Sequence, residues 1–140
     1  MSKLIDLSRF LDAQKPDYET ALAEIRNGRK ITHWIWYIFP QLKGLGYSGN
    51  AQFYGIKDQE EADAYRAHPV LGTHLVEISD ALLQLDTSNA TEVMGSPDDL
   101  KLRSCMTLFS EVPGASPVFQ KVLDKFFNGK KDEKTIDLLY

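Results

Sequence analysis

Five apolar residues between positions 71 and 85 constrain the fold more than any other feature. They are separated by four, three, four and three positions, which places them on one face of an α-helix: Leu71, Leu75, Ile78, Leu82 and Leu85. A helix with such a face must bury it against neighbouring elements. The segment therefore predicts a helix packed within a multihelical bundle.

Start and stop signals divide much of the remaining chain into helices. Aspartate and serine cap helix starts, glycine ends helices, and proline disfavours helix in the residue before it. The helices expected on these grounds are Leu4 to Leu11 before Pro16, Asp17 to Gly28, Asp58 to His68 before Pro69, Ser96 to Phe109, Ser116 to Gly129, and Asp132 to Leu139.

The middle of the chain is harder to interpret. Apolar residues run almost unbroken from Ile31 to Phe39, so periodicity does not separate helix from strand. We expect a helix, because Thr32 and Pro40 would bracket two helical turns. The glycine-rich stretch 44–55 predicts a loop, with one short extended segment at Gln52 to Ile56. We expect a mainly α fold: one domain over residues 1–140, a multihelical bundle of about six or seven helices with little or no strand.

Composition excludes several classes of protein. Sixteen basic and 20 acidic residues give a net charge of −4, which argues against nucleic acid as a partner. The single cysteine and the absence of an N-terminal apolar run predict a cytoplasmic protein. No apolar run approaches the roughly 20 residues that span a bilayer, so we expect no membrane partner.

Three glycines, Gly44, Gly46 and Gly49, match the spacing G-x-G-x-x-G of dinucleotide-binding loops. That loop follows a strand and opens a helix, whereas this one follows Pro40 and precedes a stretch without helical signals. Asn50 also occupies the position of the lysine in a phosphate loop. The glycines predict, at most, a looser cradle of backbone amides for an anion.

The segment from His33 to Gln41 is the best place for a site. Burial of His33 among aromatic rings would favour a neutral imidazole that acts as a general base, and the alternative is a core histidine that donates to a carbonyl. Trp34 and Trp36 lie about 200° apart on a helix, so one would face the core and the other a cleft. Beside the amide of Gln41, such rings suit a planar ligand such as a nucleobase or nicotinamide.

The expected helix from Ser96 adds further candidates. Asp98 and Lys101 form a surface ion pair or present a charge pair to a ligand. Ser104 is a candidate nucleophile without a nucleophile elbow, and Cys105 falls on the apolar stripe of the core. No two histidines have the spacing that would bring them together on a helix as metal ligands, so no metal site is expected.

Four segments together resemble the domain-of-unknown-function 1810 family of bacterial proteins across nearly the whole chain: ALAEIRNGRKITHWIWYIFPQLKGLGYS, AYRAHPVLGTHLVEI, GSPDDLKLRSCMTLF and FQKVLDKFFNGKKDEKTIDLL. The resemblance implies a mainly α-helical cytoplasmic domain and brings no activity or cofactor with it. By similarity to the family motif, Ser48, Tyr54 and His68 join the positions to test.

Two functions are open from the sequence. The first is a small-molecule site for a nucleotide or an ADP-ribose-like ligand, formed by the aromatic segment, the glycine loop, Asp98 and Lys101, with His33 or Ser104 as a catalytic group. The second is a protein-interaction module or homodimer, in which these residues serve folding alone. Whether the protein is an enzyme, which cofactor it uses, and whether it is a monomer or a homodimer stay open.

Overall fold

The structure of the chain, a computed structural model, describes residues 5–140 and is mainly α-helical, as predicted. Leu4, where the first predicted helix begins, lies outside these residues. Within them the chain forms nine helices and one isolated β-bridge, and none of the helices is long and apolar enough to span a membrane. The helices are α1 (Ser8–Arg26), α2 (Ile35–Ile38), α3 (Gly49–Tyr54), α4 (Gln59–Ala67), α5 (Leu71–Leu83), α6 (Ala90–Met94), α7 (Asp98–Ser110), α8 (Val118–Phe127) and α9 (Glu133–Leu139).

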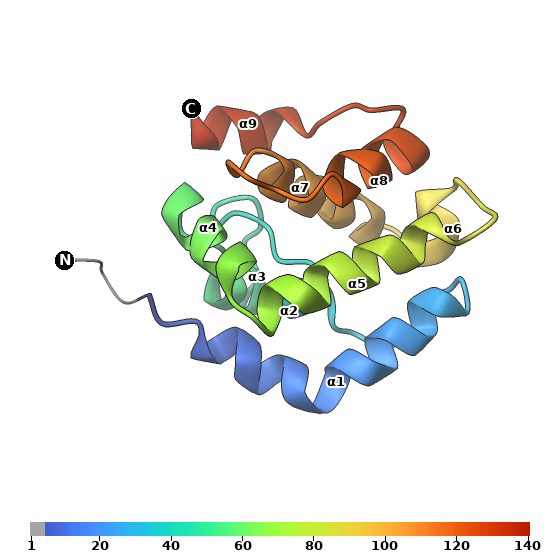
Figure 1. The fold of residues 1–140 in the computed structure, drawn as a ribbon, viewed down its shortest axis with the longest axis horizontal. Coiled ribbons are helices and arrows are strands. Elements are labelled where there is room, and N and C mark those ends of the chain that lie inside the picture. The colour runs from blue at the N-terminus through green and yellow to red at the C-terminus, as the bar shows by residue number, and fades with distance from the viewer. Residues whose placement is uncertain (1–4) are drawn as a thin grey trace.

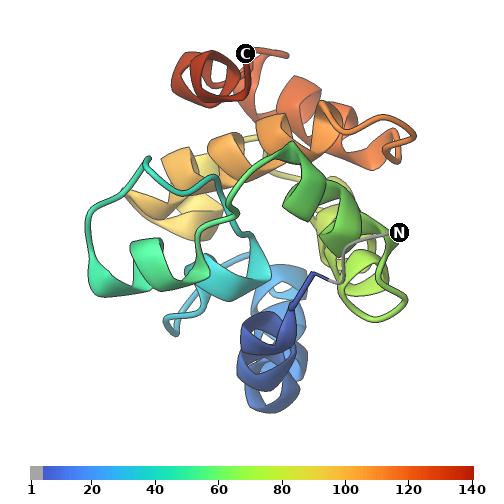
Figure 2. The ribbon, with the colours of Figure 1, turned by 90° about the vertical axis from the view of Figure 1, so that its left-hand side faces the viewer.

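Helix α5 lies at the centre of the arrangement, between α1 on one side and α7 and α8 on the other (Figure 1). Its predicted apolar face is confirmed, because the first four residues of the leucine series are buried and Leu85, just after the helix, is partly buried. Figure 2 shows α1 and α9 at opposite ends of the molecule with the other helices between them. The apolar face of α5 therefore lies at the centre of the core, as the sequence predicted.

A row of aromatic rings links four helices through this core. Phe10 of α1 meets Tyr65 of α4 edge-on, with ring centres 5.0 Å apart, and Tyr65 lies 5.3 Å from Phe109 of α7. Phe109 in turn lies 5.9 Å from Phe119 of α8. Rings of this size bury large apolar areas, so the row ties together helices that are distant in sequence.

The first two predicted helices are in fact one, and this expectation was wrong. Helix α1 continues through Pro16, and Figure 1 shows it bent near its middle. A proline inside a helix costs about 3 kcal/mol because it removes one backbone hydrogen bond. Here Phe10, Gln14 and Tyr18, four residues apart on either side of the proline, are all buried on one face. Burial of this continuous face offsets the cost.

The helix expected over residues 31–39 is reduced to the single turn α2. Glu24 explains the difference, because its carboxylate accepts hydrogen bonds from the backbone N–H groups of Ile31 at 2.7 Å and Thr32 at 3.0 Å. The Thr32 hydroxyl also donates to Glu24, at 2.7 Å, so it is not available to cap a helix. Residues 31–34 therefore wrap around a carboxylate before the helix starts.

Two short helices were not predicted. Ser48 caps α3, where a loop was expected, and its hydroxyl accepts from the Ala51 N–H at 3.1 Å. Asn89 caps α6 in the same way. Ile56 follows α3 and forms the isolated parallel bridge with Leu42. These additions largely explain why the helices outnumber the expected six or seven.

The predicted helix starts were correct in two cases and inexact in two others, since α7 begins at Asp98 and α8 at Val118, each two residues after the predicted serine. Asp58 caps α4 and Asp132 caps α9, each accepting from the backbone N–H three residues later. Ser96 does not cap α7, which begins at Asp98 after Pro97 without a side-chain cap. An aspartate therefore marks a helix start at two of the three predicted positions, because Asp17 lies inside α1.

Candidate functional site

A cavity of about 480 Å³ lies where three distant segments meet: residues 41–46, the start of α7 and the start of α9. We call it the Gln41 cavity. It is lined by Gln41, Leu45, Gly46, Pro97, Leu100, Lys101, Arg103, Ser104, Asp132, Glu133 and Lys134. Four of the residues singled out from the sequence, Gln41, Gly46, Lys101 and Ser104, thus line one cavity.

The Gln41 side chain makes no hydrogen bond within residues 5–140, although its backbone is fixed. Its carbonyl accepts from the Ile56 N–H at 2.9 Å, next to the bridge between Leu42 and Ile56. Gly46 lies close by, since a Cβ at this position would come within 3.7 Å of the Gln41 amide nitrogen and 2.8 Å of the Ala51 Cβ. The backbone of Gln41 is therefore fixed, while its side-chain amide, which can both donate and accept, has no partner among the described residues.

Lys101 and Asp98 form the predicted ion pair, and a second lysine joins them. The Lys101 ammonium lies 3.5 Å from one oxygen of Asp98, and the Lys30 ammonium lies 2.9 Å from the other. Asp98 itself does not line the cavity. Since two lysines face one carboxylate, this corner keeps an excess of positive charge.

Ser104 is tied to the start of α9. Its hydroxyl lies 3.1 Å from the Leu100 carbonyl and 3.2 Å from one carboxylate oxygen of Asp132. That oxygen also accepts from the backbone N–H and the hydroxyl of Thr135, at 3.1 and 2.6 Å. None of the chain's three histidines lines the cavity, so Ser104 lacks the imidazole that would activate a nucleophile. Its contacts fit a structural role.

His33 and Trp34 lie outside the cavity. Trp34 is buried, and its indole N–H donates to Glu24 at 3.0 Å. His33 is exposed, so the desolvated setting expected for a neutral base is absent. At the start of the aromatic segment, Trp34 therefore serves the fold, and His33 lies at the surface.

Trp34 is in the core, as expected for one of the two tryptophans, whereas Trp36 is only partly buried. The Trp36 ring does not line the cavity, but the Lys101 ammonium lies 5.4 Å from its centre. Its indole nitrogen is the one buried side-chain nitrogen or oxygen in residues 5–140 without a hydrogen-bond partner. Trp36 therefore supports Lys101 and provides no aromatic wall for a ligand.

The remaining candidates have local roles. Gly44 has a φ of +104°, a conformation that favours glycine, and Ser48 caps α3. Tyr54 packs against Tyr37 at 5.1 Å between ring centres. The imidazole of His68 accepts from the backbone N–H of Val70, at 3.1 Å, just before α5, and His68 lines a different cavity. None of these residues reaches the Gln41 cavity.

Sequence reasoning missed the contribution of α9. Arg103 donates to the carbonyls of Lys130 and Lys131, each at 2.9 Å, and thereby holds the segment before α9 against α7. Asp132 was interpreted as a cap alone, and Glu133 and Lys134 were not among the candidate site residues. Because helix packing brings these residues to the cavity, no local spacing could have revealed them.

Cys105 is fully buried, as predicted, and burial raises the pKa of its thiol. A buried, protonated thiol is a poor nucleophile and a poor metal ligand. In the described part of the chain, no group of three or more His, Cys, Asp and Glu side chains is arranged to hold a metal ion. The polar and charged residues that line the Gln41 cavity are therefore the candidates for a functional role.

A family model described as "Protein of unknown function (DUF1810)" matches residues 4–139, so the chain belongs to this family. The fold is similar to the crystal structure of the conserved hypothetical protein Rv1873 from Mycobacterium tuberculosis, with a TM-score of 0.93. The two sequences are 46% identical, and the match covers 96% of each chain. No curated protein matches the sequence. The resemblance and the mainly helical fold inferred from the sequence are both confirmed.

Proposed function

We propose that the protein binds a small anionic molecule, a nucleotide or an ADP-ribose-like compound, in the Gln41 cavity. The observation that carries the proposal is the meeting of Gln41, Lys101 and Lys134 from three distant segments in one cavity. A volume of about 480 Å³ is within the range of small-molecule sites.

The charges around the cavity suit a phosphate group. Two ammonium groups, from Lys101 and Lys134, line it, while the guanidinium of Arg103 is engaged with backbone carbonyls. Lysine binds phosphate as a compact charge with three donors. Asp132 and Glu133 also line the cavity, but the three basic residues Lys101, Arg103 and Lys134 outnumber them by one.

The remaining lining residues favour a sugar phosphate over a bare anion. Glu133 is exposed at the cavity and can accept hydrogen bonds from ribose hydroxyls, as acidic residues do in dinucleotide sites. Leu45 and Leu100 supply an apolar surface for the rest of the ligand. Since none of the lining residues is aromatic, phosphate and sugar contacts would dominate over stacking of a base.

Calorimetric titration with ADP-ribose, AMP, ribose 5-phosphate and inorganic phosphate tests the proposal. We expect ADP-ribose or AMP to bind more tightly than inorganic phosphate, and Lys101→Ala to weaken binding about tenfold, equivalent to about 1.4 kcal/mol. Lys121→Ala, an exposed lysine of α8 outside the cavity, is the matched control. Absence of binding by all four compounds, or equal binding by the Lys101 and Lys121 variants, would contradict the proposal.

A second candidate function, homodimerisation, has a specific observation in its favour. Tyr47, just before α3, and Phe53, in its last turn, are 88% and 60% exposed. Exposed aromatic residues are enriched at protein interfaces. Sedimentation velocity at several concentrations separates the two proposals: a dimer that Phe53→Ser dissociates supports an interface at α3, whereas a monomer at all concentrations removes it.

A further inference from the structure

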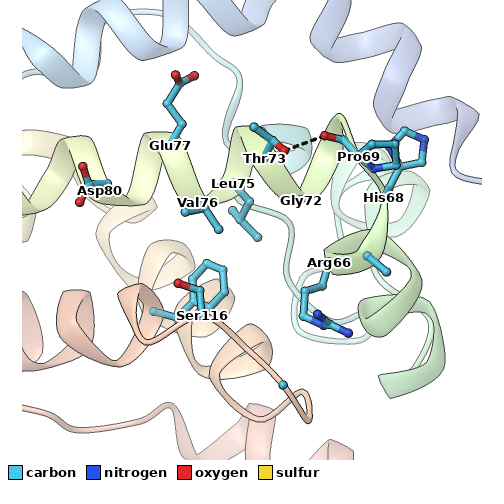
Figure 3. A pocket seen from close by; sticks show the side chains of 13 residues that line it. Arg66, His68, Pro69, Gly72, Thr73, Leu75, Val76, Glu77, Asp80 and Ser116 are labelled. Carbon is cyan, nitrogen blue, oxygen red and sulfur yellow. Dashed lines mark hydrogen bonds between the residues drawn. The ribbon is translucent and has the colours of Figure 1, made fainter.

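A larger cavity, of about 630 Å³, lies between α5 and the segment that joins α7 to α8, with the end of α4 closing one side (Figure 3). None of its lining residues belongs to the Gln41 cavity. One end has the cationic side chain of Arg66, and the other has the carboxylate of Asp80 (Figure 3). The apolar side chains of Leu75 and Val76 lie between the two charges (Figure 3), and Phe119 of α8 also lines the cavity.

We propose that this second cavity binds a short peptide with free termini, whose carboxylate pairs with Arg66 and whose ammonium pairs with Asp80. The apolar residues between them receive a side chain of the peptide. This activity is separate from the ligand proposed for the Gln41 cavity and does not depend on it.

The Arg66 guanidinium is positioned for a carboxylate. Its Nε and Nη2 atoms donate to one oxygen of Asp63, at 3.2 and 2.7 Å, which fixes the plane of the group. Its Nη1 atom has no hydrogen-bond partner within residues 5–140 and lies 4.0 Å from the place where a Cβ on Gly114 would stand. Guanidinium groups bind carboxylates through paired N–H donors. One edge of Arg66 is therefore held and the other is available at the cavity.

The acidic end has one carboxylate that is engaged and one that is free. Glu77 accepts a hydrogen bond from the Tyr18 hydroxyl, so α1 holds it on the far side of α5. Asp80 is exposed and makes no hydrogen bond or ion pair in the part of the chain that is described. An ammonium group with three donors would pair with Asp80, while Glu77 adds to the negative potential nearby.

The length of the cavity selects the class of ligand. Gly72, which packs against the Arg66 backbone, and Asp80 are eight residues apart on α5, or about 12 Å along the helix. An extended peptide of three or four residues spans about 10 to 14 Å between its termini. A free amino acid is much shorter than this backbone separation, so we infer a peptide of three or four residues as the ligand.

Calorimetry with the tripeptide Ala-Leu-Ala tests the inference against the same peptide with an acetylated N-terminus or an amidated C-terminus. We expect each blocked peptide to bind wild-type protein about tenfold more weakly, because each loses one charged contact. In Arg66→Gln the amidated and free peptides should bind equally, and in Asp80→Asn the acetylated and free peptides should bind equally. Free leucine should bind more weakly than the tripeptide.

Both substitutions replace side chains at the surface, and circular dichroism establishes that the variants are folded. Lys121→Gln, on α8 but outside the cavity, is the control and should retain wild-type affinity. The inference is overturned if wild type does not bind the tripeptide, if blocking a terminus leaves affinity unchanged, or if the blocked and free peptides still differ in the matching variant.

Discussion

The two ends of the segment from His33 to Gln41 differ in how their polar groups are satisfied. At one end, the Trp34 indole and the backbone of residues 31–32 donate to the carboxylate of Glu24. At the other end, the Gln41 amide has no partner among the described residues and lines a cavity. The motif thus divides into two parts. We call the part around Trp34, whose polar groups are satisfied by protein contacts, the structural half, and the part at Gln41, whose amide has no such contact, the available half.

Glu24 shows how completely the structural half is satisfied. Burial raises the pKa of its carboxyl, but the hydrogen bonds from Ile31, Thr32 and Trp34 lower it by more, so the pKa lies below its usual value. The ionised carboxylate is therefore the form on which the turn depends. Stability from this group is fully present above the unfolded pKa, about 4.3, and is lost as pH falls through the lower folded pKa.

Glu24→Ala should have the largest effect on stability. It leaves one buried donor, the Trp34 indole, and three partly buried donors without an acceptor, so we expect a loss of about 3 kcal/mol. Urea denaturation at pH 7 measures it, with Glu19→Ala, an exposed acid of the same helix, as the control near zero. A loss below about 1 kcal/mol would mean that Glu24 does not hold the structural half together.

The two tryptophans sharpen the comparison. Trp34→Phe removes a buried hydrogen bond to a carboxylate and should cost about 2 kcal/mol. Trp36→Phe removes an indole nitrogen that has no partner, which offsets the lost packing, so we expect a cost below about 1 kcal/mol. Thermal denaturation of both variants compares them directly, and equal losses would argue against the division.

Gln41→Ala tests the available half. Because its amide makes no hydrogen bond in residues 5–140, we expect the free energy of unfolding to change by less than about 0.5 kcal/mol. Affinity for ADP-ribose should nevertheless fall about tenfold, since the ligand loses a donor and an acceptor. A variant that unfolds readily would show that Gln41 belongs with Glu24 as a structural residue.

The smallest effect is expected at His74, a satisfied polar group of α5 outside the motif. Its ring stacks on Tyr18 with centres 3.6 Å apart, and its Nδ1 lies 2.8 Å from the Gln14 amide oxygen. Burial lowers the pKa of His74, and the carboxylates of Glu77 and Glu19 only partly counter it. The depressed pKa gives stability above about pH 6.5 that declines as pH falls below it.

His74→Gln should therefore flatten the pH dependence of stability between about pH 7 and pH 5, measured as the urea midpoint at each pH. His33→Gln, at an exposed histidine, is the matched control and should keep the slope of the wild type. If both variants kept that slope, the stacked imidazole would not be the group that titrates with folding.

Much of the fold could be predicted because its signals are local. The apolar face of α5 and the aspartate caps of α4 and α9 depend on residues three or four positions apart. The single helix through Pro16 and the turn around Glu24 depend on tertiary burial and on contacts across seven to ten residues. Neither the single helix nor the turn could therefore be predicted from local sequence signals.

The site was predictable only in part for the same reason. Gln41, Lys101 and Ser104 were selected by residue type and family resemblance, and the structure brings them to one cavity. His33 was selected for its aromatic neighbours, but the chain turns it outward. Glu133 and Lys134 reach the cavity because α9 packs on α7, and a single sequence has no local mark of that packing.

Titration of ¹⁵N-labelled protein with ADP-ribose, followed by NMR, tests the central claim most directly. The Gln41 side-chain amide and the Trp34 indole each give their own N–H signals, so both halves of the motif are observed in one experiment. We predict that the Gln41 amide and the backbone of Lys101 shift on binding while the Trp34 indole stays in place. Shifts confined to Trp34 and His33, or no shifts at all, would contradict a ligand site at Gln41.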